Sequence, residues 1–136
     1  MQSILVDAGP LVALFRANDS YHECSKAFVG GNARPLVTTW PVLTEVCFFL
    51  NAHGKSRLLT WVQRGGLRLH PIAENDLPVI QTLIDKYGDR IDLADASLVW
   101  LGTKLKIKDI ITIDRDDFSV YRGIDGKPFR NLLKLS

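Results

Sequence analysis

The sequence predicts an α/β protein, specifically a three-layer α/β/α sandwich around a central parallel sheet. Short β-prone runs alternate with longer stretches of helical spacing, and strands separated by helices pair in parallel through right-handed crossovers. Such a sheet needs helices on both faces, because its strands are buried on both sides. The expected strands are residues 3–6, 36–39, 67–69 and 109–113, with 131–135 as a weaker candidate.

The helices are predicted from apolar residues spaced three and four apart and from the residues at their ends. They are expected over residues 11–15, 20–29, 41–50, 55–64, 74–87 and 92–106. The helix over 41–50 is apolar nearly all round, Pro41 suits its first turn, and Gly54 is a plausible C-cap beyond it. The segment from residue 118 onward has a weaker pattern.

The composition indicates an ordinary globular protein, since 46% of the 136 residues are apolar and 24% are charged. This length suits one hydrophobic core, so residues 1–136 are expected to form a single domain. The apolar runs are shorter than a membrane helix and the first residues lack a signal-peptide pattern, so we expect a cytoplasmic protein that does not bind membranes. A net charge of +2 is too small to indicate nucleic-acid binding by itself.

Two aspartates stand where predicted strands end. Asp7 follows the first strand, and Asp114 follows the buried run Ile-Ile-Thr-Ile. In open parallel sheets, ligands bind beyond the carboxyl ends of the strands. Parallel pairing is therefore expected to bring Asp7 and Asp114 to the same edge of the sheet.

Glu45 is expected within an apolar helix. Its neighbours three and four positions away include Val42, Phe48 and Phe49, so no adjacent basic residue is available to pair with it. Burying an unpaired carboxylate is costly, and a metal ion would relieve that cost. The alternative is that Glu45 bonds to backbone amides or lies at the rim of the core.

Asp92 and Asp95 open the predicted helix over 92–106 with the spacing of a capping box, in which Asp92 accepts from the amide of Asp95 and Asp95 reaches back. The helix dipole also favours acids in a first turn, so Asp92 is either a metal ligand or only a cap. Asp95 lies in line with Leu98 and Val99 on the inward face, which favours a functional role. Asp117 is interpreted as a solvated loop acid.

Together these acids predict an oxygen-rich pocket of the kind that holds Mg²⁺ or Mn²⁺. Clustered carboxylates repel one another and cost stability unless a cation neutralises them. Such ions activate water, orient a phosphate and stabilise the charge on the leaving oxygen. The pattern therefore indicates phosphodiester hydrolysis, with metal ligands among Asp7, Glu45, Asp92, Asp95 and Asp114.

The order of these motifs resembles that of PIN-domain nucleases, most of all the VapC-type toxins of prokaryotic toxin-antitoxin systems. The motifs are Ile-Leu-Val-Asp7, Leu-Thr-Glu45-Val, Asp92-Leu-Ala-Asp95 and Ile-Thr-Ile-Asp114, and they extend over nearly the whole chain. The resemblance implies a PIN-like sandwich and a Mg²⁺- or Mn²⁺-dependent endoribonuclease with Asp7, Glu45, Asp95 and Asp114 as catalytic metal ligands. It also implies an RNA substrate, a homodimer and a cognate antitoxin that blocks the site.

The chain departs from this pattern at Ala8, where many relatives have Ser or Thr. Thr112 lies two residues before Asp114 on the same side of the strand, where its hydroxyl would support a ligand or the substrate instead. Thr is also simply a favoured strand residue. The other candidate substrate contacts are Arg115 and Arg122, from a basic cluster in the final segment, although surface arginines are commonly only solvated.

Two other functions remain open from the sequence. A non-catalytic PIN-like module would hold RNA or a protein without cutting, although a pure binder gains nothing from costly clustered charges. A structure-specific DNA nuclease would share the same metal site, because recognition of the 2′-hydroxyl depends on groove shape. A haloacid-dehalogenase-type phosphatase is excluded, since Gly9 stands where that class needs Asp.

Overall fold

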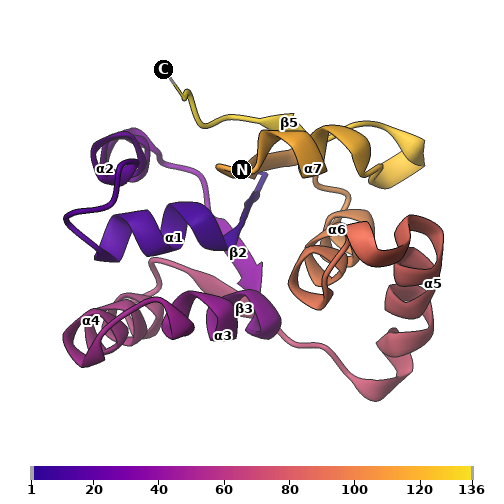
Figure 1. Ribbon diagram of the computed structural model, residues 1–136, viewed down its shortest axis with the longest axis horizontal. Coiled ribbons are helices and arrows are strands. Elements are labelled where there is room, and N and C mark those ends of the chain that lie inside the picture. Colours follow the sequence, from indigo (N-terminus) through magenta and orange to yellow (C-terminus); the bar gives the residue numbers. More distant parts are fainter. Residues whose placement is uncertain (1, 136) are drawn as a thin grey trace.

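Parallel strands form the centre of the structure, and helices cover both faces of their sheet (Figure 1). The computed structural model describes residues 2–135. The strands are β1 (Ile4–Val6), β2 (Leu36–Thr39), β3 (Arg68–His70), β4 (Asp109–Ile111) and β5 (Arg130–Asn131). Their order in the sheet is β3-β2-β1-β4-β5, and every neighbouring pair is parallel.

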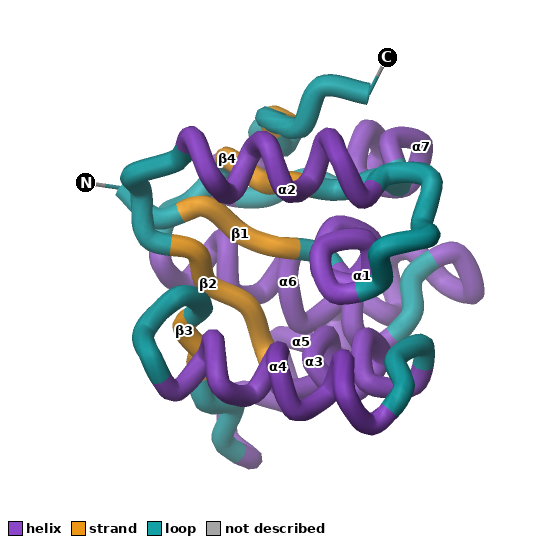
Figure 2. The backbone as a smooth tube through the Cα atoms, turned by 90° about the vertical axis from the view of Figure 1, so that its left-hand side faces the viewer, coloured by secondary structure: helices purple, strands orange, loops and turns teal. Residues whose placement is uncertain are grey.

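The helices form the two outer layers. They are α1 (Ala8–Phe15), α2 (His22–Gly31), α3 (Trp40–Phe48), α4 (Ala52–Gln63), α5 (Leu77–Tyr87), α6 (Leu93–Leu105) and α7 (Arg115–Val120). Short 3-10 turns occur at η1 (Glu74–Asp76), η2 (Gly88–Arg90) and η3 (Ile124–Gly126). Helices α1, α2 and α4 lie on one side of the sheet, and α5 and α6 lie on the other (Figure 2). The predicted α/β/α sandwich with a parallel sheet is confirmed. Across residues 2–135, none of the helices has the length and apolar character needed to cross a membrane.

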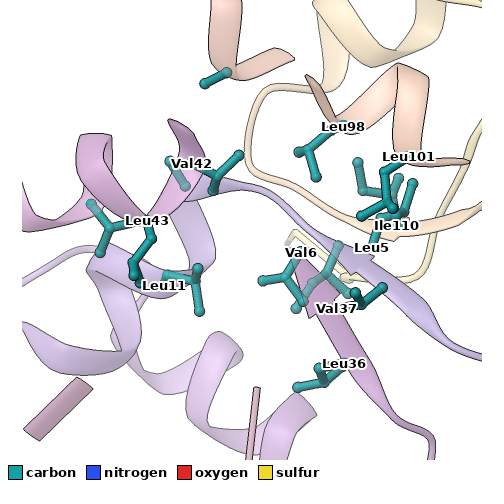
Figure 3. Close-up of a cluster of buried hydrophobic side chains, with 14 of the residues drawn as sticks. Leu5, Val6, Leu11, Leu36, Val37, Val42, Leu43, Leu98, Leu101 and Ile110 are labelled. Atoms are coloured by element: carbon teal, nitrogen blue, oxygen red, sulfur yellow. The ribbon is translucent and has the colours of Figure 1, made fainter. Parts of the chain in front are cut away.

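The hydrophobic core lies between the sheet and its helices (Figure 3). Residues Ile4–Val6 are fully buried, because β1 is the middle strand of the sheet. Helix α6 contacts β2 and contributes the fully buried Leu98 and Leu101. A continuous apolar run is typical of a strand that is covered on both faces, which explains why β1 shows no alternation of polar and apolar residues.

Several element boundaries differ from the sequence prediction. Gly54 is not a C-cap, because α3 ends at Phe48 and Gly54 lies in the first turn of α4. The amide of Gly54 donates to the side chain of Asn51 at 2.8 Å, and Asn is a favoured N-cap residue, so Asn51 begins a new helix here. Strand β5 covers Arg130–Asn131 rather than residues 131–135.

One side of α3 is apolar and exposed. Trp40, Phe48 and Phe49 are 55%, 86% and 53% exposed, and the two phenylalanine rings contact edge to face with centroids 5.7 Å apart. The apolar residues that the sequence places nearly all round this helix are therefore not all in the core. The helix supplies an aromatic surface, formed by Trp40, Phe48 and Phe49, as well as part of the core.

Asp109 joins strands at the amino end of the sheet. Its carboxylate is buried, and it accepts from Arg34 Nη2 at 2.7 Å and from Arg130 Nε and Nη2 at 2.8 and 3.0 Å. Burial alone would raise the pKa of Asp109, but the bonds from Arg130 and Arg34 outweigh it and lower the pKa below 3.8. These charge-assisted bonds connect the start of β4 to β5 and to the segment that leads into β2.

We expect Asp109→Asn to lower the free energy of unfolding at neutral pH by about 2 kcal/mol, because two guanidinium groups lose their charged partner. The lowered pKa gives the sign of the pH dependence. The stabilisation is present above about pH 4 and is lost as the pH falls through the pKa of folded Asp109. Denaturant unfolding at a series of pH values measures both effects. Asp85→Asn, on an exposed part of α5, is the matched control, and equal stability of the two variants would contradict this role.

Candidate functional site

Asp7 lies at the carboxyl end of β1, where the chain turns into α1. It is the N-cap of that helix, and its Oδ1 accepts from the amide of Ala8 at 2.8 Å. Only 6% of the residue is exposed. The turn from strand to helix therefore holds a buried carboxylate at the edge of the sheet where ligands are expected.

Thr112 connects Asp7 to Asp114. Its hydroxyl donates to Asp7 Oδ2 at 2.7 Å and accepts from the amide of Asp114 at 3.0 Å. The side chain of Asn131 fixes Thr112 in turn, because Oδ1 accepts from the Thr112 amide at 3.1 Å and Nδ2 donates to the Thr112 carbonyl at 3.0 Å. Thr112 is fully buried, and its two hydrogen bonds hold Asp7 and the backbone of Asp114 in place. This is the supporting role that the sequence offered for its hydroxyl.

Asp114 is delivered differently from Asp7. The sequence predicts that Asp114 ends a strand over 109–113, but β4 ends at Ile111 and Asp114 is the N-cap of α7, where its Oδ1 accepts from the amide of Asp117 at 3.1 Å. Helix α7 occupies a segment that was expected to be a loop. The prediction of the strand end was wrong, but Asp114 still reaches the same edge as Asp7.

Asp92 and Asp95 open α6. Asp92 is the N-cap, and its Oδ1 accepts from the amide of Asp95 at 2.8 Å, which confirms one half of the predicted capping box. The other half is not formed as expected, because Asp95 Oδ2 instead accepts from the hydroxyl of Tyr121 at 3.1 Å. The Asp95 carboxylate is therefore positioned by a residue that lies far along the chain.

All of these acids line one cavity of about 690 Å³. Glu45 reaches it from α3 and is half-buried, so it lies at the rim of the core rather than inside it. The aromatic ring of Phe49 also lines the cavity. The acidic residues of the lining are Asp7, Glu45, Asp92, Asp95, Asp114 and Asp117.

The pKa values of Asp7, Glu45 and Asp95 are raised, so these acids hold their protons more tightly than usual. Burial raises the pKa of Asp7 to about 6, against the lowering effect of its bonds from Thr112 and Ala8. Burial, followed by the negative charges of Asp7 and Asp92, raises the pKa of Asp95 to about 8. The same causes raise the pKa of Glu45, with burial again the largest. These carboxylates are therefore costly to ionise in the cavity when no cation is bound.

The donor set fits a hard divalent cation, because Mg²⁺ and Mn²⁺ prefer carboxylate oxygens. Among residues 2–135, no three His, Cys, Asp or Glu side chains already lie close enough to hold a metal ion. The carboxylates are arranged around the cavity, so rotation of their side chains would have to bring them together on an ion. A divalent ion bound among these carboxylates would lower the cost of ionising them.

Comparisons with known proteins give relatives in sequence and in fold. No family model matches the chain. Ribonuclease VapC26 of Mycobacterium tuberculosis (strain ATCC 25618 / H37Rv) is 26% identical over 131 residues, which cover 93% of this chain and 97% of that protein. The crystal structure of VapC20 from Mycobacterium tuberculosis, a Sarcin-Ricin loop cleaving toxin, superposes with a TM-score of 0.76 at 19% identity, over 84% of this chain and 92% of that one. The chain is therefore similar in sequence to a VapC-type ribonuclease over nearly its whole length and shares the fold of a VapC toxin. A toxin-antitoxin complex from Klebsiella pneumoniae contains a chain with the same fold, with a TM-score of 0.67 at 18% identity over 89% of this chain and 94% of that one.

The predicted substrate arginines do not line the acidic cavity. The Arg122 guanidinium donates to the backbone carbonyls of Ser119, Val120 and Tyr121 at 2.7, 3.1 and 3.2 Å, so it caps the end of α7. Arg115 lines a separate cavity on the other side of α7 from the acids. A role for either residue in binding substrate remains a prediction.

The basic residues that line the acidic cavity are Arg16 and Arg90, and sequence reasoning did not single them out. Arg90 Nε pairs with Asp117 Oδ1 at 3.3 Å, so the interpretation of Asp117 as a solvated loop acid was wrong. Tyr121 was also missed. The signal that would have indicated Arg90 is its position two residues before Asp92, in the turn that leads into the acidic helix start.

In metal-free buffer, we expect Asp95→Asn to stabilise the protein at alkaline pH. Because the pKa of folded Asp95 is raised to about 8, the contribution of Asp95 to stability is fully present below its unfolded pKa and is lost as the pH rises through about 8. The substitution should raise the free energy of unfolding by about 2 kcal/mol above that pH, after allowance for solvent screening, with the gain vanishing towards about pH 4. Thermal melts in EDTA measure the effect beside the Asp85→Asn control. A gain that does not change with pH would contradict the raised pKa.

Proposed function

We propose that this chain is a divalent-metal-dependent endoribonuclease that acts as the toxin of a toxin-antitoxin pair. The observation that carries the proposal is the convergence of carboxylates from four separate segments on one cavity at the carboxyl edge of the sheet. Their raised pKa values indicate a site that favours an added cation. The likeness to the ribonuclease VapC26 along nearly its whole length supports the same activity.

Asp7, Glu45, Asp95 and Asp114 would hold Mg²⁺ or Mn²⁺, with Asp92 as a further ligand or only as the cap of α6. When bound, the ion supplies an activated water and positive charge for the phosphate. In the hydrolysis, the water oxygen bonds to phosphorus and the bond from phosphorus to the leaving ribose oxygen breaks. The protein's own contribution is to hold these carboxylates in place around the cavity.

RNA is the substrate that we propose, and the phosphate contacts come from the basic residues around the cavity. Arg16 and Arg90 line it directly. Arg115 and Arg122 lie on α7 and immediately after it, so they would meet the RNA farther from the scissile bond. Phosphate contacts of this kind position the strand and carry no sequence information.

The proposed partners follow from the surface and from the relatives. We propose that a cognate antitoxin covers the site, as expected for a chain whose fold also occurs in a toxin-antitoxin complex. A homodimer would cover the exposed aromatic side chains of Trp40, Phe48 and Phe49. The whole chain would act as a single nuclease domain in the cytoplasm.

Purified protein should cut a mixed single-stranded RNA pool in the presence of Mg²⁺ or Mn²⁺ and not in EDTA. Asp7→Asn and Asp95→Asn should each reduce the rate by about 100-fold or more, the scale on which loss of a charge-stabilising group acts, while Asp85→Asn should not. The same assay with a DNA pool tests the DNA nuclease. RNA that is bound but uncut under every metal condition would favour the non-catalytic binding module and overturn the nuclease proposal.

Arg115→Ala and Arg122→Ala should each weaken RNA binding to a similar degree for all sequences and should reduce the slope of log affinity against log salt by about one. The measurement is fluorescence anisotropy in EDTA, which prevents cutting. Lys55→Ala on the exposed part of α4 is the control. Salt slopes equal to that of the control would remove both arginines from the proposed RNA path.

A further inference from the structure

Tyr121 is a buried residue whose hydroxyl contacts Asp95, one of the acids that line the cavity. The residue is fully buried and directly follows α7. Its hydroxyl lies 3.1 Å from Asp95 Oδ2 and 3.1 Å from the carbonyl oxygen of Arg90. Both partners belong to the segment that opens α6, so a single side chain joins the end of α7 to the start of the acidic helix.

Aromatic packing fixes the position of this hydroxyl. The Tyr121 ring contacts Phe118 and Tyr87 edge to face, with centroids 5.2 and 5.0 Å away. A ring held on two sides has little freedom to move, and the phenol oxygen is rigidly attached to it. The hydroxyl is therefore a fixed point beside the carboxylate of Asp95.

The hydroxyl has one proton and two acceptors. A carbonyl oxygen and an ionised carboxylate both accept only, so Tyr121 donates to one of them or shares its proton between them. The charged carboxylate is the stronger acceptor. Burial and the charge of Asp95 raise the pKa of Tyr121, so the hydroxyl keeps its proton and remains a donor.

We propose that Tyr121 is a positioning residue, whose hydroxyl holds Asp95 Oδ2 against the protein so that Oδ1 is presented to the divalent ion and the scissile phosphate. This inference rests on the proposed metal-dependent cleavage. Without the hydroxyl, the Asp95 side chain gains freedom to rotate, and an ion must restrict that rotation when it binds. The loss therefore falls on metal affinity and on the chemical step, while RNA binding through phosphate contacts is retained.

Tyr87 provides the matched control. It belongs to the same aromatic cluster, and its hydroxyl accepts from the backbone amide of Arg122 at 2.8 Å. Tyr87→Phe and Tyr121→Phe therefore each remove one phenolic hydroxyl and its hydrogen bonding from the same region. Only Tyr121→Phe removes a contact to an acid of the cavity.

Calorimetry of Mn²⁺ binding to the full chain tests the proposal. We expect Tyr121→Phe to weaken Mn²⁺ affinity on the order of tenfold and to lower kcat with little change in KM, while Tyr87→Phe stays close to the unaltered protein. Thermal melts show whether both variants are folded. Mn²⁺ affinity and kcat that are the same in the two variants would overturn the inference. An unaltered protein that neither binds Mn²⁺ nor cuts RNA would instead overturn the proposed function.

A second measurement needs no substitution. The chain has three tyrosines, so labelling their ring carbons next to the hydroxyl with ¹³C gives three signals. Titration with Mg²⁺ should shift the Tyr121 signal until the site is saturated and leave the Tyr87 signal in place. A Tyr121 signal that does not move while Mg²⁺ binds would overturn the inference even if Tyr121→Phe failed to fold.

Discussion

Mutual repulsion between carboxylates at one edge of the sheet is the constraint on which the rest of the site depends. Neutral donors hold most of these acids: the Ala8 amide and the Thr112 hydroxyl bind Asp7, and the Tyr121 hydroxyl binds Asp95. Such donors fix the direction of a carboxylate without cancelling its charge. The fold thus supplies the geometry of a cation site and leaves its charge available.

The opposite end of the sheet shows what the same residue type does with the other kind of partner. Asp109 is also buried, but two guanidinium groups bind it, and its pKa is lowered rather than raised. Its contribution is therefore to stability. Asp109, whose charge is neutralised, holds the strands together at the start of β4. The acids of the cavity lie beyond the other end of β4. Because the two groups are apart, one small sheet provides both stability and a cation site.

The sequence predicted the layers of the fold and the acids that meet, because both depend on local patterns. Apolar runs and strand-end aspartates are visible in a window of a few residues. The prediction missed one contact between distant residues and two local ones. Tyr121 is 26 residues from Asp95 and nothing near it in the sequence indicates that contact. The sequence also did not indicate that the Arg122 guanidinium binds carbonyl oxygens at the end of α7. Gly54 was misread because Asn51 begins a helix directly after α3 ends.

Strand β5 has a consequence beyond its size. It contributes no acid to the cavity. The side chain of Asn131 nevertheless hydrogen-bonds to both the amide and the carbonyl of Thr112, and the Thr112 hydroxyl donates to Asp7. Asn131 thus helps to hold Asp7 in position through Thr112. A tag, fusion or truncation that displaces β5 would disturb the cavity without touching any carboxylate, and loss of function in such a protein would be a scaffold effect rather than evidence about the chemistry.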